Sequence, residues 1–182
     1  MTEQEFRAVY PLIPGWIQQT LAEHASAAWP VTSLGFNRLP HYHDEKTLAS
    51  AKVVCVPRVP VPPLSAVGLA RFGEFERSDM AAITYLDTYF VRADNARAES
   101  LHFHELVHVI QWRLLGPEKF VALYADGLER LGHRNSPLEV MAYSFQERFD
   151  REAKPFSVEA ACESSIQDMT SHGDGPAFLN RP

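Results

Sequence analysis

A pair of histidines four residues apart, inside the longest predicted helix, constrains this chain more than any other feature. The sequence HELVH occupies residues 104–108, within a segment that we expect to be helical from about residue 94 to 115. Residues four apart lie one above the other on a helix face, so the rings of His104 and His108 can both reach one tetrahedral metal ion. Glu105 lies beside that face, where it can act as a base. The alternative is a pair of histidines that are hydrogen-bonded in a core.

A catalytic metal site of this kind needs a third ligand from the protein. A histidine six residues after His108 would complete one common pattern, but Leu114 stands there. Glu139 is the candidate instead, because it begins a helix predicted over 137–150, where the helix dipole favours a carboxylate. The same glutamate ends the sequence Ser136-x-x-Glu139, a capping box in which it would only bond back to the Ser136 amide. The sequence leaves both roles of Glu139 open.

With HExxH at 104–108 and Glu-x-x-Ala at 139–142, the chain resembles the gluzincin metallopeptidases. These include thermolysin-like enzymes, the small minigluzincins and the CAAX-processing proteases. The resemblance covers roughly residues 83–150. It implies a zincin-like fold in which the strand before the helix is an edge strand that binds an extended peptide.

The resemblance also implies a role for each matching residue. The zinc ligands would be His104, His108 and Glu139, and Glu105 would be the general base. One position departs from the family pattern. Four residues after the ligand glutamate the family often has an aspartate that orients a zinc-bound histidine, and this chain has Tyr143. Either another group orients that histidine, or Tyr143 has a different role.

The expected fold is α+β and zincin-like, with a small, mainly antiparallel sheet beside a helical C-terminal half. The clearest strand is ITYLDTYFVR at 83–92, in which neither alternating face is wholly apolar. KVVCV at 52–56 is a second strand. The prolines at 57–63 favour a sheet edge or a polyproline-like loop at this point.

Helices are expected at 3–24, interrupted by Pro11 and Pro14, and at 94–115, 117–131, 137–150 and 158–169. Asp94 or Asn95 would cap the second of these helices, and Gly116 followed by Pro117 would end it. Residues 30–50 are expected to be mostly loop. We interpret residues 1–170 as a single domain and residues 171–182 as a loose C-terminal tail.

Other polar residues are weaker candidates for the site. Tyr143 lies one helical turn after Glu139, so its hydroxyl could donate to an oxyanion, although a buried tyrosine with one satisfied hydroxyl is the commoner case. His102 is expected to point away from the metal face. Gln111 could line the cleft, or it could be a simple polar contact at the rim. Tyr124 and His133 are lesser candidates for the same donor role as Tyr143. His41 and His43 could form a metal-binding pair in a loop, although such a pair usually lies at the surface.

The composition argues against some classes of binding partner. Seventeen Lys and Arg against 23 Asp and Glu give a net charge of −6, so a basic surface for nucleic acid is not expected. No run of apolar residues is long enough for a membrane helix, and the N-terminus does not read as a signal peptide. Cys55 and Cys162 are too few for a disulfide framework. We therefore expect a cytoplasmic protein with reduced thiols.

The function expected from these features is that of a zinc-dependent metallopeptidase, which hydrolyses peptide bonds of a peptide or protein substrate. A zinc-activated water would attack the carbonyl, with Glu105 as the general base. The alternatives are a non-enzymatic zinc-binding scaffold and a hydrolase of another amide or ester. Manganese or cobalt would also suit these ligands.

Overall fold

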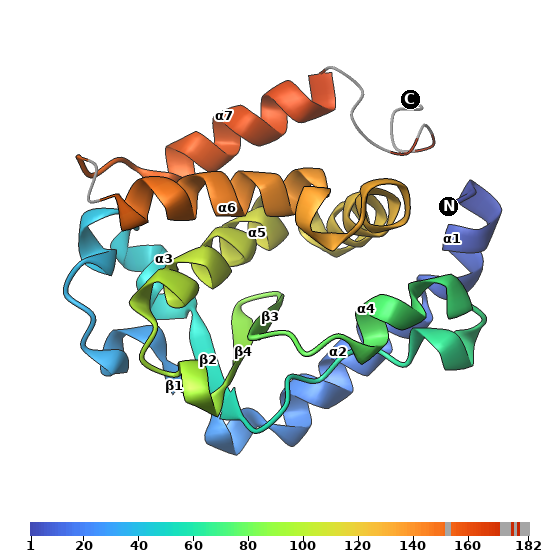
Figure 1. Cartoon of the computed structure of the whole chain (residues 1–182), viewed down its shortest axis with the longest axis horizontal. Coiled ribbons are helices and arrows are strands. Elements are labelled where there is room, and N and C mark those ends of the chain that lie inside the picture. The colour runs from blue at the N-terminus through green and yellow to red at the C-terminus, as the bar shows by residue number, and fades with distance from the viewer. Residues whose placement is uncertain (152–153, 172–175, 177, 179–182) are drawn as a thin grey trace.

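The computed structural model describes residues 1–151, 154–171, 176 and 178, and it is an α+β fold with mostly helical content (Figure 1). The helices are α1 (Glu3–Val9), α2 (Leu12–Glu23), α3 (Glu45–Ser50), α4 (Gly73–Arg77), α5 (Glu99–Leu131), α6 (Pro137–Asp150) and α7 (Val158–Ser171). The strands are β1 (Trp29–Pro30), β2 (Lys52–Val56), β3 (Ala82–Tyr85) and β4 (Thr88–Arg92).

The four strands form one mixed sheet in the order β1-β2-β4-β3. β1 pairs with β2 and β3 pairs with β4 in antiparallel fashion, but the central pair, β2 with β4, is parallel. The expectation of a mainly antiparallel sheet therefore missed the central pair. The chain between β2 and β4 is long enough for the crossover that parallel neighbours need. Of the two alternatives for the proline segment, the sheet edge was wrong, because β2 pairs with both β1 and β4, and residues 57–63 lie in a loop after β2.

The single strand expected at 83–92 is a hairpin. β3 and β4 flank a two-residue turn at Leu86 and Asp87, and Leu86 has a positive φ of 60°. Such a φ is uncommon for a residue other than glycine, asparagine or aspartate. Tyr85 pairs with Thr88, so these side chains share a face of the sheet and the alternation expected for a single strand breaks at the turn. The hairpin makes β3 the edge strand next to β4.

The helix predictions were mostly confirmed. α1 and α2 are separated at the first proline, and α6 begins with Pro137 at its first position. The backbone of Gly116 is not helical, with φ 71° and ψ 165°, so α5 consists of two helical segments that meet at the expected stop. The expected caps were wrong, because Asp94 and Asn95 lie in a 3₁₀ turn before the helix.

One further expectation was wrong, and another concerns residues that are mostly not described. Residues 30–50, expected to be mostly loop, include α3 and short 3₁₀ turns. Most of the expected tail, residues 172–175, 177 and 179–182, lies outside the described residues. Within the part of the chain that is described, no helix is both long and apolar enough to cross a membrane.

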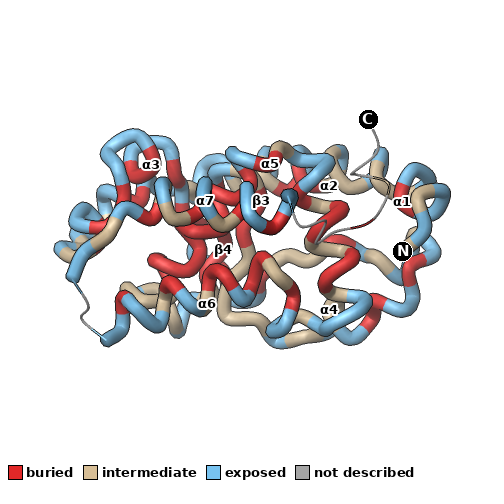
Figure 2. Tube along the Cα trace, turned by 90° about the horizontal axis from the view of Figure 1, so that it is seen from above, coloured by how far each residue is buried: buried red, intermediate tan, exposed pale blue. Residues whose placement is uncertain are grey.

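The first segment of α5 passes through the middle of the molecule, between the sheet and the pair α6 and α7 (Figure 1). Figure 2 shows many buried residues in this central part of the molecule. Phe103 and Phe149 stack with their ring centres 4.5 Å apart, which packs α5 against α6. Trp112 donates from Nε1 to the Thr84 carbonyl at 3.1 Å, which fixes α5 against β3. The histidine pair is thereby held on a helix that is packed on both sides.

Candidate metal centre

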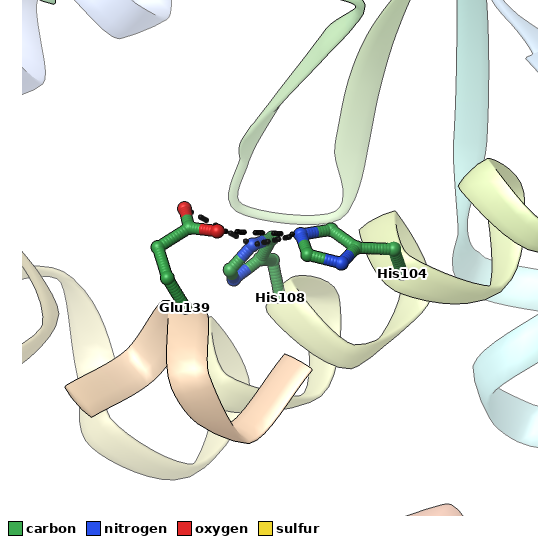
Figure 3. A group of neighbouring side chains, drawn as sticks. All are labelled: His104, His108 and Glu139. Carbon is green, nitrogen blue, oxygen red and sulfur yellow. Dashed lines mark hydrogen bonds and ion pairs between the residues drawn. The ribbon is translucent and has the colours of Figure 1, made fainter. Parts of the chain in front are cut away.

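Three buried side chains from α5 and α6 meet at one point (Figure 3). The Nε2 atoms of His104 and His108 are 3.1 Å apart. One Glu139 oxygen, Oε2, lies 3.4 Å from Nε2 of His104, and the other, Oε1, lies 3.5 Å from Nε2 of His108. Each residue therefore offers one ligand atom toward a common centre, and the group could hold a metal ion.

Two glutamines fix the orientation of the rings. Nδ1 of His104 lies 3.0 Å from Oε1 of Gln146, and Nδ1 of His108 lies 2.8 Å from Oε1 of Gln111. The amide groups are oriented by their own donor bonds, from Gln146 to the Ser100 hydroxyl and from Gln111 to the Leu138 carbonyl. Because Oε1 can only accept, each ring must donate from Nδ1. In the neutral rings, the Nε2 lone pairs then point at the common centre.

Glu139 is not a helix cap. The Ser136 side chain makes no capping bond to the described residues, and its hydroxyl is buried. Instead, Oε1 of Glu139 accepts from the Tyr124 hydroxyl at 2.8 Å and lies 3.2 Å from Nε2 of His133. Oε2 is buried and accepts no hydrogen bond from the described residues. This buried oxygen lies beside two histidines without a hydrogen-bond donor among those residues, and a metal ion would satisfy it.

The three groups stabilise each other's charge. Burial opposes the ionised form of Glu139, but the rings of His108, His104 and His133 outweigh it and hold the pKa of this carboxyl well below its usual range. Burial also lowers the pKa of His108, yet the carboxylates of Glu139 and Glu105 and the hydrogen bond with Gln111 together outweigh burial and raise that pKa to about 9. The ionised Glu139 carboxylate thus places one negative charge at the site, where it can balance a cation.

Glu105 is buried beside these three residues, but its carboxylate is hydrogen-bonded to a different partner. Its Oε2 accepts from the Thr84 hydroxyl on β3 at 2.6 Å. This bond holds the carboxylate in place and leaves Oε1 for another partner. Sequence reasoning missed Thr84, because nothing in a strand pattern marks a hydroxyl that will face a helix.

Tyr143 lies against the site, with its ring centre 4.6 Å from that of His104. Burial, followed by the charge of Glu139, raises the pKa of the Tyr143 hydroxyl, so it stays protonated at neutral pH. It does not replace the family's orienting aspartate, because Gln146 does that for His104. Gln146 was also missed, although its position seven residues after Glu139, on the same helix face, is a usable signal.

His102, His41 and His43 are not part of the group, whereas His133 contacts Glu139. His102 is buried on the other side of α5, as expected, and its ring contacts the Tyr89 hydroxyl at 2.8 Å and the Ala96 carbonyl at 3.1 Å. His41 is exposed, whereas His43 is buried with Nδ1 3.6 Å from Glu159. The loop pair therefore does not converge on one point.

The edge of β3 beside the site has backbone groups that do not pair with β4. The Arg92 N–H bonds to the Ala81 carbonyl, so in the antiparallel register the intervening residues Ala82 and Thr84 face outward. The Thr84 carbonyl is already bonded to Trp112. Ala82 can therefore still offer both an N–H and a C=O to an added strand.

A cavity of about 310 Å³ opens onto the group. The polar side chains of its wall at the metal end include Glu105, Tyr143 and Gln146. The wall continues along β3, the second segment of α5, and helices α1 and α2. The candidate metal centre is thus accessible from a chamber within the fold.

Comparison with known proteins does not identify the chain. No family model matches the sequence, and neither a curated protein nor a solved structure is significantly similar to it. The assignment of function therefore rests on the geometry of the site.

Proposed function

We propose that this protein is a zinc-dependent, zincin-like hydrolase of peptide bonds, with His104, His108 and Glu139 as the zinc ligands. One observation carries the proposal. In a tetrahedral site with bonds of about 2.0–2.1 Å, neighbouring ligand atoms are about 3.3 Å apart. The two Nε2 atoms are 3.1 Å apart, and each lies near a different oxygen of Glu139: Oε2 is 3.4 Å from Nε2 of His104, and Oε1 is 3.5 Å from Nε2 of His108. One ligand atom from each of the three residues lies within 4.8 Å of the other two. The donor set, two imidazoles and one carboxylate, is also one that catalytic zinc uses.

The hydrogen bonds around the rings require a positive charge between them. Both Nδ1 atoms donate to glutamine oxygens, so the two Nε2 atoms face each other over 3.1 Å. Their lone pairs would repel each other unless a positive charge lies between them. The raised pKa of His108, about 9, supplies a proton there, and a metal ion would take the place of that proton. Glu139 supplies the balancing negative charge.

A zinc ion bound there would polarise the scissile carbonyl and lower the pKa of its attacking water. Glu105 would accept the proton of this water through the oxygen that Thr84 leaves free and later donate it to the leaving amine. Tyr143, as a neutral hydroxyl, would donate a hydrogen bond to the developing oxyanion. Each role falls to a side chain that lines the cavity.

The free edge of β3 supports a peptide as the substrate. An extended chain that adds to an exposed edge gains backbone hydrogen bonds without the need for a particular sequence. Ala82 offers such bonds beside Glu105. A peptide on this edge would have its scissile bond near the metal group.

Replacement of Glu105 by Gln tests the proposal. Size and helix preference are kept, and Glu105 is outside the ligand group, so fold and zinc content should remain. General-base catalysis contributes roughly 10²–10⁴-fold, so kcat on unfolded casein should fall by about that factor while KM changes little. Glu118→Gln, at an exposed position on the second segment of α5, is the control.

A Glu105→Gln variant that keeps both its zinc and its full rate would refute the mechanism. A metal-loaded wild type that cleaves nothing across a broad peptide library would instead favour the zinc-binding scaffold.

A further inference from the structure

The cavity beside the metal group has walls that suit one kind of occupant. Away from the site, its lining side chains are apolar or tyrosine, with Phe6, Ile13, Leu69 and Phe72 among them. A peptide backbone carries one donor and one acceptor per residue, and burying them without partners costs several kcal/mol. The edge of β3 can supply hydrogen-bond partners to a peptide backbone, but the side chains of the rest of the chamber cannot. These walls therefore suit a hydrocarbon group.

The tyrosines do not change this character. The Tyr85 hydroxyl donates to the Pro60 carbonyl at 2.8 Å, and the Tyr124 hydroxyl donates to Glu139. Both are thus engaged within the protein. Tyr143 lies at the metal end, which leaves Tyr10 as the tyrosine of the outer chamber.

The size of the chamber distinguishes between hydrocarbon groups. An apolar cavity of about 150 Å³ holds a single benzene ring. At about 310 Å³, this chamber is twice as large and has room for more than one aromatic side chain of a peptide. It is also at the lower end of the range for ligand pockets, roughly 300–1,000 Å³, so it suits a slender ligand. An extended alkyl chain fits this volume and needs no polar partner along the chamber.

We propose that the substrate carries a long unbranched hydrocarbon chain, such as a fatty-acyl group, next to the bond that is cleaved, and that this chain lies in the apolar chamber. The inference rests on the proposed hydrolase function, because the metal group at the chamber's polar end is where the reacting carbonyl would lie. It narrows the substrate from peptides in general to acylated peptides and related fatty-acyl amides.

Binding of alkyl hydroxamates tests the inference without measuring activity. The head group chelates zinc, and the tail can be lengthened from acetohydroxamate to hexano- and decanohydroxamate. Calorimetry on the zinc-loaded protein should show affinity rising by up to about fourfold for each methylene group that enters the chamber. Equal affinities of the short and long compounds would overturn the inference while leaving the metal centre intact.

A second ligand separates this inference from the proposed function. 1-Decanol has the tail but no chelating head, so it should bind even to protein stripped of metal. If decanol binds and acetohydroxamate does not, the chamber is supported and the zinc hydrolase fails. Absence of decanol binding to the folded protein would contradict the chamber's role.

A matched pair of variants locates the binding. Ala125 lies on α5 and lines the chamber, so Ala125→Phe should abolish the dependence on chain length while zinc content and acetohydroxamate binding stay unchanged. Ala160→Phe, at an exposed position of α7, should change none of these. If Ala125→Phe does not fold, Val121→Phe fills the same wall one turn earlier. A long-chain preference that survives a folded chamber variant would place the tail elsewhere.

Discussion

His104 and Gln146 lie 42 positions apart in the sequence, yet Nδ1 of the ring and Oε1 of the amide are 3.0 Å apart. This contact joins α5 to α6 and selects the ring nitrogen that faces Glu139. Groups that orient a metal ligand in this way typically change metal affinity by 10–100-fold when they are removed.

We therefore expect Gln146→Leu to weaken zinc binding by roughly 10–100-fold, measured by competition with a chromogenic chelator. Gln146→Glu keeps an acceptor for the ring N–H and should restore most of the affinity. The control is Gln167→Leu, at an exposed position of α7. Equal zinc affinity in Gln146→Leu and the wild type would show that the ring needs no partner.

The purified protein should carry one zinc per chain, and His104→Ala or His108→Ala should remove most of it, because two ligands rarely hold zinc. Elemental analysis measures this directly. His102→Ala is the matched control, since His102 is a buried histidine of the same helix that contacts Tyr89 instead of Glu139. It should lose stability but keep its metal. Full metal in both ligand variants would place the zinc elsewhere.

Two tyrosines should separate catalysis from metal binding. Tyr143→Phe removes the proposed oxyanion donor, so kcat should fall by roughly 10²–10³-fold with zinc content unchanged. Tyr124→Phe removes a hydrogen bond to Glu139, so it should chiefly alter zinc affinity. Steady-state rates and chelator competition measure the two effects. A loss of zinc affinity in Tyr143→Phe, or a loss of kcat with normal zinc affinity in Tyr124→Phe, would contradict these roles.

The stability of the fold should depend on pH through Glu159. Burial opposes ionisation of this carboxyl, but the His43 ring and the backbone N–H groups of Glu159 and Asp44 lower its pKa from 4.5 to about 2. A carboxyl whose pKa is lower in the folded state contributes stability above its unfolded pKa, and that contribution is lost as pH falls from about 4.5 toward 2.

Urea unfolding at several pH values checks this effect. Wild type should be more stable than Glu159→Gln at pH 7, and the difference should shrink on acidification through that range. The control is Glu163→Gln, at an exposed position of the same helix. Parallel stability curves for wild type and Glu159→Gln would show that the Glu159 carboxylate makes no net contribution.

The features that could be predicted from the sequence depend on neighbouring residues. The histidine spacing, the break at Gly116 and the start of α6 at Pro137 each follow from one helical turn or one backbone restriction. The third member of the metal group, Glu139, needed a separate argument, and its capping alternative was locally just as reasonable. Only the packing of α6 on α5 brings this carboxylate to the rings.

The features that were missed depend on contacts between distant segments or on an unusual local conformation. The turn at Leu86 uses a residue that seldom adopts a positive φ, so the hairpin has none of the usual signals. The parallel pairing of β2 with β4 is decided by how the intervening chain crosses over. Thr84 and Gln146 act across the interface of α5 with β3 and α6, which a periodicity in one element does not reveal.

Gly116 and Gly132 stand at the two ends of the second segment of α5, with φ/ψ of 71°/165° and 77°/167°. This region of backbone space is open essentially to glycine alone. A Cβ added at either position would meet no atom within 4 Å. Open space around a residue normally signals tolerance to mutation, but here the backbone itself excludes other residues. A mutational scan would therefore find two intolerant surface positions that touch nothing, at the limits of the segment that forms the chamber wall.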